Sequence, residues 1–348
     1  MIRTVSFRYV IMRSGADYTE IYPTADSIPV VRMDDSGEIK TSFSGVFQDP
    51  GDEVDWLTDQ IRPEMVLDGM TYPLGIYLPA TVMYAENETT KTVQIEAYDR
   101  CWQVKALCTE DQKYFAGELN YLSAVGSLLS EAGIDSVSED KTDLTLMEGR
   151  EDWNIGTPAL DIVNQLLGEI NYKQLWFDAN GTAMLQAERL PRAENISHTL
   201  DDTKIESMLI PQIQRQTDTY SAPNVFICVC SNADKDEPMI AMAENTNPQS
   251  PLSIARRRRR ITQVVQLNNI ASQDELQSYA NRLVSSSMMR GETIQVETAL
   301  LPGFGVGEVV ALRYGDIMTL TIERSWSMNL TVGGRMQHTL EKVVMSVE

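Results

Sequence analysis

The segment Lys91–Leu107, KTVQIEAYDRCWQVKAL, constrains the possible fold more than any other part of this chain. Its apolar residues Val93, Ile95 and Ala97 occupy every second position, which is the pattern of a strand with one buried face. Short strand patterns and turn formers precede this segment, and the first strong helical patterns follow it. We therefore predict that a β domain ends here and that a helical module begins.

Residues 1–107 are predicted to form a small antiparallel β-barrel or sandwich. Turn formers such as those at residues 34–37 and 49–52 separate short apolar runs, and no long segment with a helical period interrupts them. The predicted strands are Val5–Met12, Ile28–Met33, Ile39–Phe47, Gly75–Val82 and Thr92–Trp102.

Residues 108–195 are predicted to form an α+β module of two helices and a β-hairpin. Asn120 is expected to cap a helix that stops at Gly133. Thr157 is expected to cap a second helix, with Pro158 at its first helical position. The expected hairpin strands are Gln174–Phe177 and Thr182–Ala187, joined by the turn sequence DANG.

Residues 196–348 are predicted to form a second β-barrel that carries a helix at 272–289, with a capping box at Ser272–Glu275. The expected fold class is therefore α+β and mainly β, with an α+β module between two small antiparallel barrels. The predicted strands are Asn224–Cys230, Pro238–Ala243, Ile261–Leu267, Thr293–Leu300, Glu308–Arg313, Met318–Ser327 and Gln337–Val347.

The charge of the chain limits the partners that it can bind. Its 29 basic and 50 acidic residues give a formal net charge of −21, which repels nucleic-acid phosphates. Residues 196–348 hold 14 of the basic residues, so any contact with an acidic partner is expected there. We predict no specific nucleic-acid binding. No apolar run approaches the length of a membrane span, and no signal peptide is recognised, so a cytoplasmic site of synthesis and no membrane contact are expected.

Histidine and cysteine, which often carry catalysis or bind metals, are scarce. The two histidines, His198 and His338, are expected at strand edges or on the surface. Cys228 and Cys230 lie in the run VFICVC and are expected to be buried free thiols on one side of a strand. No metal-binding spacing, Walker motif or hydrolase motif is found. We therefore predict no catalytic residue, no metal and no cofactor.

Five consecutive arginines, Arg256, Arg257, Arg258, Arg259 and Arg260, form the one strong candidate site. If they enter the strand that begins at Ile261, alternate side chains point to opposite faces. Guanidinium groups are suited to carboxylates at an interface, so an inter-subunit contact is the favoured interpretation. A solvated run that protects a sheet edge is the alternative, and contact with nucleic acid ranks third.

Several strings in the chain resemble the baseplate hub proteins of bacteriophage tails, tail-like bacteriocins and related contractile injection systems. They are EAYDRCWQVKAL at 96–107, TPALDIVNQLLGEINYKQLWFDANGTAML at 157–185, TLDDTKIESMLIPQIQRQTDTYSAPNVFICVC at 199–230 and NPQSPLSIARRRRRI at 247–261. The helix expected after the last string and the strand VGEVV at 306–310 are similar too.

The resemblance implies a structural protein of a virion tail or a phage-tail-like particle, assembled in the bacterial host cytoplasm. Such hubs are homotrimers in which each subunit supplies two tube-like β-barrels. The resemblance therefore implies that residues 1–107 form the first tube-like β-barrel and residues 196–348 the second. The implied partners are the hexameric tail tube protein above, the threefold spike or tail-tip protein below, and, as a further candidate, the tape-measure protein. DNA or an effector would pass through the lumen.

Two other functions compete with the hub. One is a tail-associated cell-wall hydrolase that uses two carboxylates, and the other is a host-recognition tail protein. The fifty carboxylates supply chance pairs but no hydrolase signature. An aromatic content of 7% disfavours carbohydrate recognition. We therefore expect a non-enzymatic protein.

Overall fold

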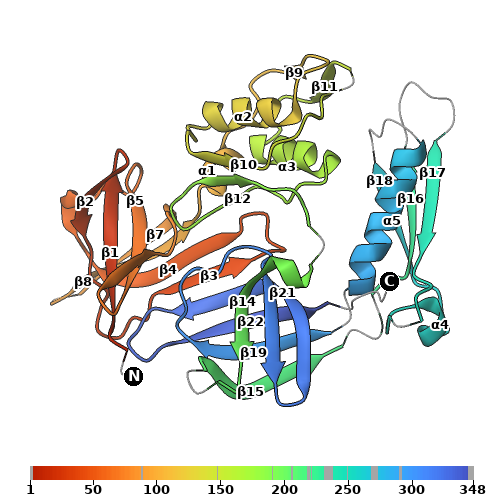
Figure 1. The fold of residues 1–348 in the computed structure, drawn as a ribbon. Helices are drawn as coiled ribbons and strands as arrows, with labels where there is room; N and C mark the ends of the chain where they lie inside the picture. Colours follow the sequence, from red (N-terminus) through yellow and green to blue (C-terminus); the bar gives the residue numbers. More distant parts are fainter. Residues whose placement is uncertain are drawn as a thin grey trace. The chain divides into compact units, whose positions relative to one another are not determined.

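The computed structural model describes residues 3–343 except 88, 147, 190, 205–206, 218–219, 221, 231–237, 249, 268–272 and 290–291. It consists mainly of antiparallel strands with few helices, which confirms the predicted α+β, mainly β fold class (Figure 1). Two compact units are found, and each is described by itself. Within the described residues, no helix combines the length and apolar composition that a membrane span requires.

The first unit comprises Met1–Leu190, Thr298–Gly307 and Arg324–His338. Its strands and helices are β1 (Val5–Arg13), β2 (Ala16–Glu20), β3 (Val30–Asp34), β4 (Thr41–Gln48), β5 (Gln60–Leu67), β6 (Met70–Pro73), β7 (Leu78–Glu86), β8 (Lys91–Tyr98), α1 (Cys101–Ala106), β9 (Lys113–Phe115), α2 (Tyr121–Glu131), β10 (Val137–Glu139), β11 (Arg150–Trp153), α3 (Ala159–Glu169), β12 (Trp176–Phe177) and β13 (Ala183–Leu185).

The second unit comprises Pro191–Glu297, Glu308–Glu323 and Thr339–Glu348. It contains β14 (Ile196–Asp201), β15 (Leu209–Gln216), β16 (Val225–Cys230), β17 (Met239–Glu244), α4 (Ile254–Arg257), β18 (Thr262–Leu267), α5 (Gln273–Met289) and β20 (Val309–Tyr314). Three strands contribute residues to both units, namely β19 (Thr293–Ala299), β21 (Ile317–Asn329) and β22 (Arg335–Lys342). The predicted domains 1–107, 108–195 and 196–348 stay a prediction.

Two sheets pack face to face at the start of the first unit. One has the order β2-β1-β5-β6, and the other contains β3, β4, β8 and β7 in that order. Aromatic side chains join them: the ring of Tyr9 on β1 lies 5.1 Å from that of Phe47 on β4, and Phe43 lies 5.7 Å from Tyr77. Since all four rings are buried, they form the centre of this β region.

The end of β8 differs from the sequence prediction. The strand stops at Tyr98 instead of reaching Trp102, because the buried Asp99 ends it and begins α1. Asp99 accepts hydrogen bonds from the Cys101 amide at 2.8 Å and from the Thr41 amide at 2.7 Å. Only Asp99 and Arg100 therefore separate the strand from the helix, at the point where the alternating pattern is lost.

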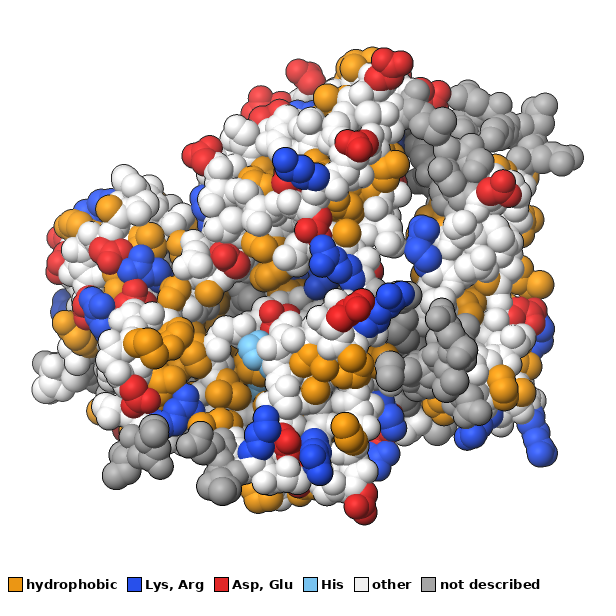
Figure 2. Space-filling view, in the orientation of Figure 1, with side chains coloured by type: hydrophobic (Ala, Val, Ile, Leu, Met, Phe, Trp, Pro, Cys, Tyr) orange, Lys and Arg blue, Asp and Glu red, His pale blue; other side chains and the backbone are white. Residues whose placement is uncertain are grey.

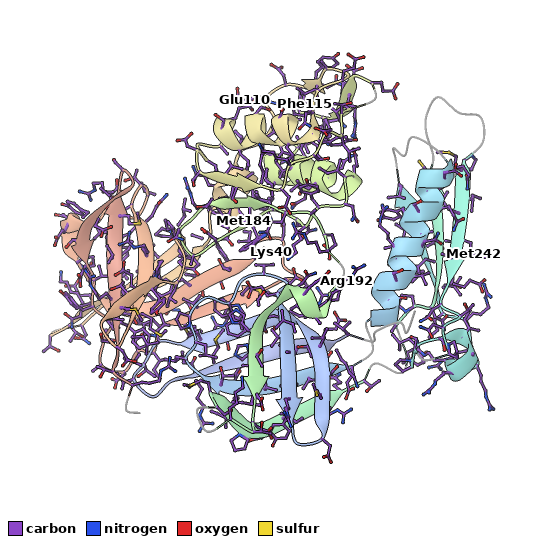
Figure 3. The ribbon with its side chains drawn as sticks, viewed as in Figure 1. Lys40, Glu110, Phe115, Met184, Arg192 and Met242 are labelled. Carbon is purple, nitrogen blue, oxygen red and sulfur yellow. The ribbon has the colours of Figure 1, made fainter. Side chains whose placement is uncertain are left out.

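The buried Lys40 connects the β region to the α+β module within the first unit (Figure 3). Its ammonium group donates to the carbonyl oxygens of Asp35 and Gly37 and to Oε1 of Gln174, each at 2.7 Å. Burial lowers the pKa of Lys40. The three acceptors replace the water that the ammonium group loses.

The helices of the α+β module form where the sequence predicted them, with one different cap. Asn120 caps α2 as expected, since its side chain accepts from the amides of Leu122 and Ser123. The predicted Thr157 cap of α3 is wrong, because Pro158 has the extended backbone of the cap and the helix begins at Ala159. The two helices pack on a shared core of leucine, isoleucine, valine and aromatic side chains.

The predicted hairpin is confirmed as β12 and β13, which pair in antiparallel fashion. Asp178 fixes its turn, since Oδ1 accepts from the amides of Asn180 at 2.9 Å and Thr182 at 2.8 Å. The third strand, β10, pairs in parallel with β13 and was missed. Its exposed sequence VSE lacks an alternating apolar pattern.

The second unit contains a small sheet with a helix on one face. The strand order is β17-β16-β18, and α5 packs against it. Cys228 and Cys230 are buried on the helix side as predicted, and burial raises the pKa of the Cys228 thiol. Ser272 of the predicted capping box lies outside the described residues.

The predicted surface position of His338 is wrong. His338 lies on β22 with 1% exposure, and its Nε2 is 2.9 Å from Oγ1 of Thr298. His198 is half-buried on β14, where its Nε2 is 2.9 Å from a carboxylate oxygen of Glu308. Each histidine therefore has a structural partner within its own unit.

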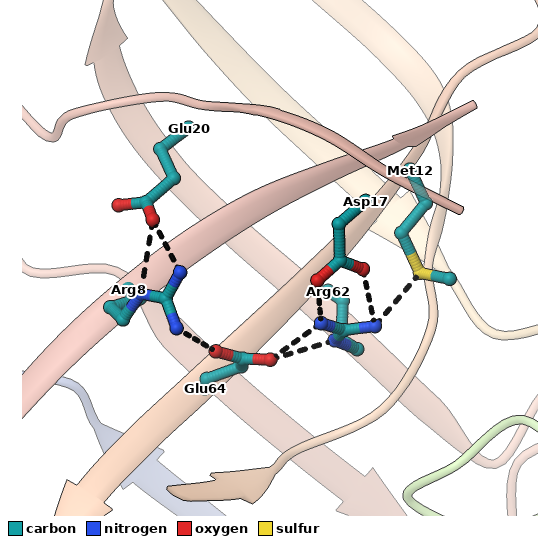
Figure 4. A network of polar contacts seen from close by, with 6 residues as sticks. All are labelled: Arg8, Met12, Asp17, Glu20, Arg62 and Glu64. Carbon is teal, nitrogen blue, oxygen red and sulfur yellow. Dashed lines mark hydrogen bonds and ion pairs between the residues drawn. The ribbon is translucent and has the colours of Figure 1, made fainter. Parts of the chain in front are cut away.

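A five-membered ionic network crosses β2, β1 and β5 (Figure 4). The buried Glu64 carboxylate lies between Arg8, at 3.2 Å, and Arg62, at 2.7 Å. The outer members are Glu20, 2.5 Å from Arg8, and Asp17, 2.9 Å from Arg62. Because Glu64 separates two guanidinium groups, it is the member that the network can least lose.

We expect Glu64→Gln to lower the free energy of unfolding by about 1–3 kcal/mol, because two arginines would then share a buried neutral amide. The control is Asp17→Asn, whose carboxylate is 59% exposed. It should cost less than about 1 kcal/mol. Denaturant midpoints measure both variants. Equal losses would contradict a central role for Glu64.

Candidate assembly interface

The arginine run is helical and turned, not extended. Ser253 caps α4 by accepting from the Arg256 amide at 3.3 Å. Arg256 and Arg257 lie in the helix, and Arg258 ends it with a left-handed backbone at φ +53°. The expected alternation of arginines on two faces of a strand is therefore wrong, since β18 begins only at Thr262.

The buried Asn224 side chain holds the chain on both sides of α4. Its Nδ2 donates to the carbonyl oxygens of Leu252 at 3.1 Å and Arg259 at 3.0 Å. Its Oδ1 accepts from the Ile261 amide at 2.7 Å. Since one fully buried amide joins three points of the segment, the backbone around the arginines has a defined path.

A second buried asparagine fixes the chain before α4. Asn245 Nδ2 donates to Oγ of Ser250 at 2.9 Å, and the Asn245 carbonyl accepts from the Ile254 amide at 3.0 Å. Asn245 and Ser250 are fully buried, as is Ser253. Asn224, Asn245 and Ser250 were not predicted from the sequence, although polar residues at the ends of the apolar strands β16 and β17 were a signal that side chains cap the connecting segment.

Three of the arginines make contacts within the second unit. Arg256 Nε donates to the Pro248 carbonyl at 3.1 Å, and Arg257 donates to the Ala222 carbonyl. Arg260 forms an ion pair with Glu244, which raises the pKa of Arg260. These side chains help to hold the segment in place, so they are less available to a partner than those of Arg258 and Arg259.

The remaining two arginines extend toward solvent. The guanidinium of Arg259 lies 5.5 Å from the ring centre of Tyr220, which is 79% exposed. Arg258 is exposed, and its side chain contacts no hydrogen-bonding or ionic partner among the described residues. Figure 2 shows Lys and Arg side chains gathered at the lower right, over the region of α4. Arg258 is therefore the arginine most available for a contact with another molecule.

The arrangement suits recognition of carboxylates. Guanidinium groups held on a rigid backbone bind planar anions with defined geometry. In the part of the chain that the structure describes, no three His, Cys, Asp or Glu side chains gather in a way that could hold a metal ion. We therefore treat Arg256–Arg260 as a candidate binding surface.

No protein family model and no curated protein sequence matches the chain. The chain is similar in structure to the tail protein from Neisseria meningitidis MC58, with a TM-score of 0.69, 13% identity, and coverage of 97% of this chain and 96% of that chain. It is also similar to the 43 kDa tail protein of prophage MuSo2 from Shewanella oneidensis, with a TM-score of 0.67, 11% identity and coverage of 97% and 98%. For the prophage tail protein gp18 from Listeria monocytogenes EGD-e, the TM-score is 0.61, the identity 11%, and the coverage 98% and 96%. These similarities confirm, at the level of fold, the expected resemblance to tail proteins.

We expect Asn224→Ala to lower the free energy of unfolding by about 1–3 kcal/mol, because it leaves buried backbone groups without partners. Hydrogen exchange at the Ile261 amide should accelerate. The matched control is Asn281→Ala on α5, where the side chain is exposed and the change should stay within about 0.5 kcal/mol. If Asn224→Ala behaves like this control, Asn224 does not hold the arginine segment.

Proposed function

We propose that this chain, which has the fold of prophage tail proteins, is a structural hub of a phage tail or a phage-tail-like particle. In this proposal, three copies form a ring that joins the hexameric tail tube to the threefold spike or tip. The observation that carries the proposal is similarity to three tail proteins that extends over nearly the whole of each chain. A likeness confined to one domain would support it far less.

The distribution of β structure supports a ring of three copies. Each of the two units contains its own antiparallel pairing, β1 with β5 in the first and β20 with β21 in the second. If both β regions of a chain line the ring, three chains present six similar elements to a hexameric tube. The same ring presents threefold symmetry to a spike.

The acidity supports a role as a passage. A net charge of −21 per chain gives a trimer a strongly negative field. Carboxylates that face a lumen would repel DNA phosphates and prevent adhesion during transfer. The proposed partners are the tail tube protein, the spike or tail-tip protein and the tape-measure protein. The proposed location is the tail of the particle, which assembles in the bacterial host cytoplasm.

The proposal predicts three copies of the chain in each particle. Isotope-labelled peptide standards for this chain and for the tail tube protein measure the copy number in purified particles. The tube protein serves as the internal control, because its copies should be a multiple of six. A chain present at six or more copies, or absent from intact tails, would contradict the proposed hub.

We further propose that the chain is not an enzyme, and we expect no lysis in zymograms made with several bacterial cell walls. The positive control is a known peptidoglycan hydrolase in the same gel. Clear lysis by the purified chain that disappears when one carboxylate is replaced by its amide would favour a cell-wall hydrolase instead. The copy number in particles tests the hub independently of this experiment.

A further inference from the structure

The face of the sheet β17-β16-β18 that points away from α5 carries apolar side chains from all three strands, with polar residues such as Gln266 beside them. Phe226, Cys228 and Cys230 pack against the helix, so the residues between them on β16 belong to the opposite face. We define the apolar sheet face as Ile227 and Val229 on β16, Ile240 and Met242 on β17, and Val264 on β18. Figure 3 marks Met242 on this sheet.

The strand register brings these five side chains together. Ile227 lies opposite both Met242 and Val264, and Val229 lies opposite Ile240. The exposed fractions are 56% for Ile240, 50% for Met242 and 58% for Val264. Three adjacent strands therefore present one contiguous apolar area to solvent, which is uncommon on a protein without a partner.

The edge formed by β17 is already covered. The side-chain amide of Gln273 donates to the Ile240 carbonyl at 2.8 Å, and that of Gln277 donates to the Met242 carbonyl at 3.0 Å. These bonds occupy backbone acceptors that could otherwise pair with another strand. The available contact area is thus the face of the sheet and not its β17 edge.

The arginine segment borders this face. Arg260 pairs with Glu244 on β17, and its Nη2 lies 4.0 Å from Sδ of Met242. The exposed Arg258 is two residues away in the chain. An apolar centre next to fixed guanidinium groups has the composition of a protein interface, where arginine and methionine are enriched.

The charge of this part of the chain differs from that of the rest. Residues 224–289 contain seven basic and six acidic residues, whereas the remainder contains 22 basic and 44 acidic residues. A second copy of the chain therefore offers a surface of opposite charge. The same patch on that copy does not, because ten arginines would then face one another.

We infer that the apolar sheet face and its arginine border bind a different, acidic surface of a second copy of this chain. A contact between two unlike surfaces is heterologous, and it closes into a ring when the rotation between copies permits. A two-fold dimer through this face is disfavoured by charge. The inference rests on the proposed ring and assigns one side of its subunit contact.

The first test replaces two exposed apolar side chains of the sheet face by polar ones and, in a separate variant, reverses the charge of Arg258. Met242→Gln with Val264→Thr, and separately Arg258→Glu, should each reduce incorporation of the chain into particles about tenfold or more. Met318→Gln is the matched control, because Met318 is 85% exposed on β21 outside this face. Purified variants should melt within about 2 °C of the unmodified chain. Normal incorporation of both test variants would overturn the inference.

The second test identifies the occupant. A photo-crosslinking phenylalanine derivative at position 242 in assembled particles should yield a covalent dimer of this chain, joined to an acidic segment outside residues 224–289. A dimer joined through residues 224–289 of both copies would overturn the heterologous contact. A product with another tail protein would overturn the choice of a second copy. The count of unmodified chains per particle tests the proposed ring separately from both outcomes.

Discussion

The first unit depends on two buried polar side chains near the start of β4. Lys40 directly precedes that strand, and Asp99 directly follows β8. Asp99 joins Thr41 to the first turn of α1, and Lys40 joins the β3–β4 turn to Gln174 before β12. Burial raises the pKa of Asp99 and lowers that of Lys40. An unpartnered buried polar group is costly, so these bonds specify one path from the β region into the helical module.

The same region binds segments from late in the sequence. Arg324 lies 2.5 Å from Asp35, whose carbonyl accepts from Lys40. Lys173, one residue before Gln174, donates to the Val306 and Gly307 carbonyls. Residues near 306 and 324 therefore belong to the first compact unit although they lie far along the chain. In the second unit, Asn224 has a comparable role, because its buried amide fixes the backbone that presents the arginines.

Local signals in the sequence predicted local structure well. The Asn120 cap and the DANG turn depend on side chains within four residues of the groups that they bind, so their patterns are visible in one short window. The missed features depend on distant partners. Asp99 ends β8 early because it binds Thr41, and the arginine segment is turned because Asn224 binds it across 35 residues. The candidate site could be located from the run of arginines, but its geometry and the apolar face beside it could not.

In the proposed hub, three copies of this chain form a ring at the end of the tail tube, and the position of the chain in the particle tests this most directly. A cryo-electron microscopy reconstruction of the tail end, made from particles of the host that carries the gene, would show it. If the chain is the proposed hub, density for three copies of the fold will lie between the last hexameric tube ring and the spike or tip. Density for the chain at another position, or with a symmetry other than threefold, would overturn the proposed hub.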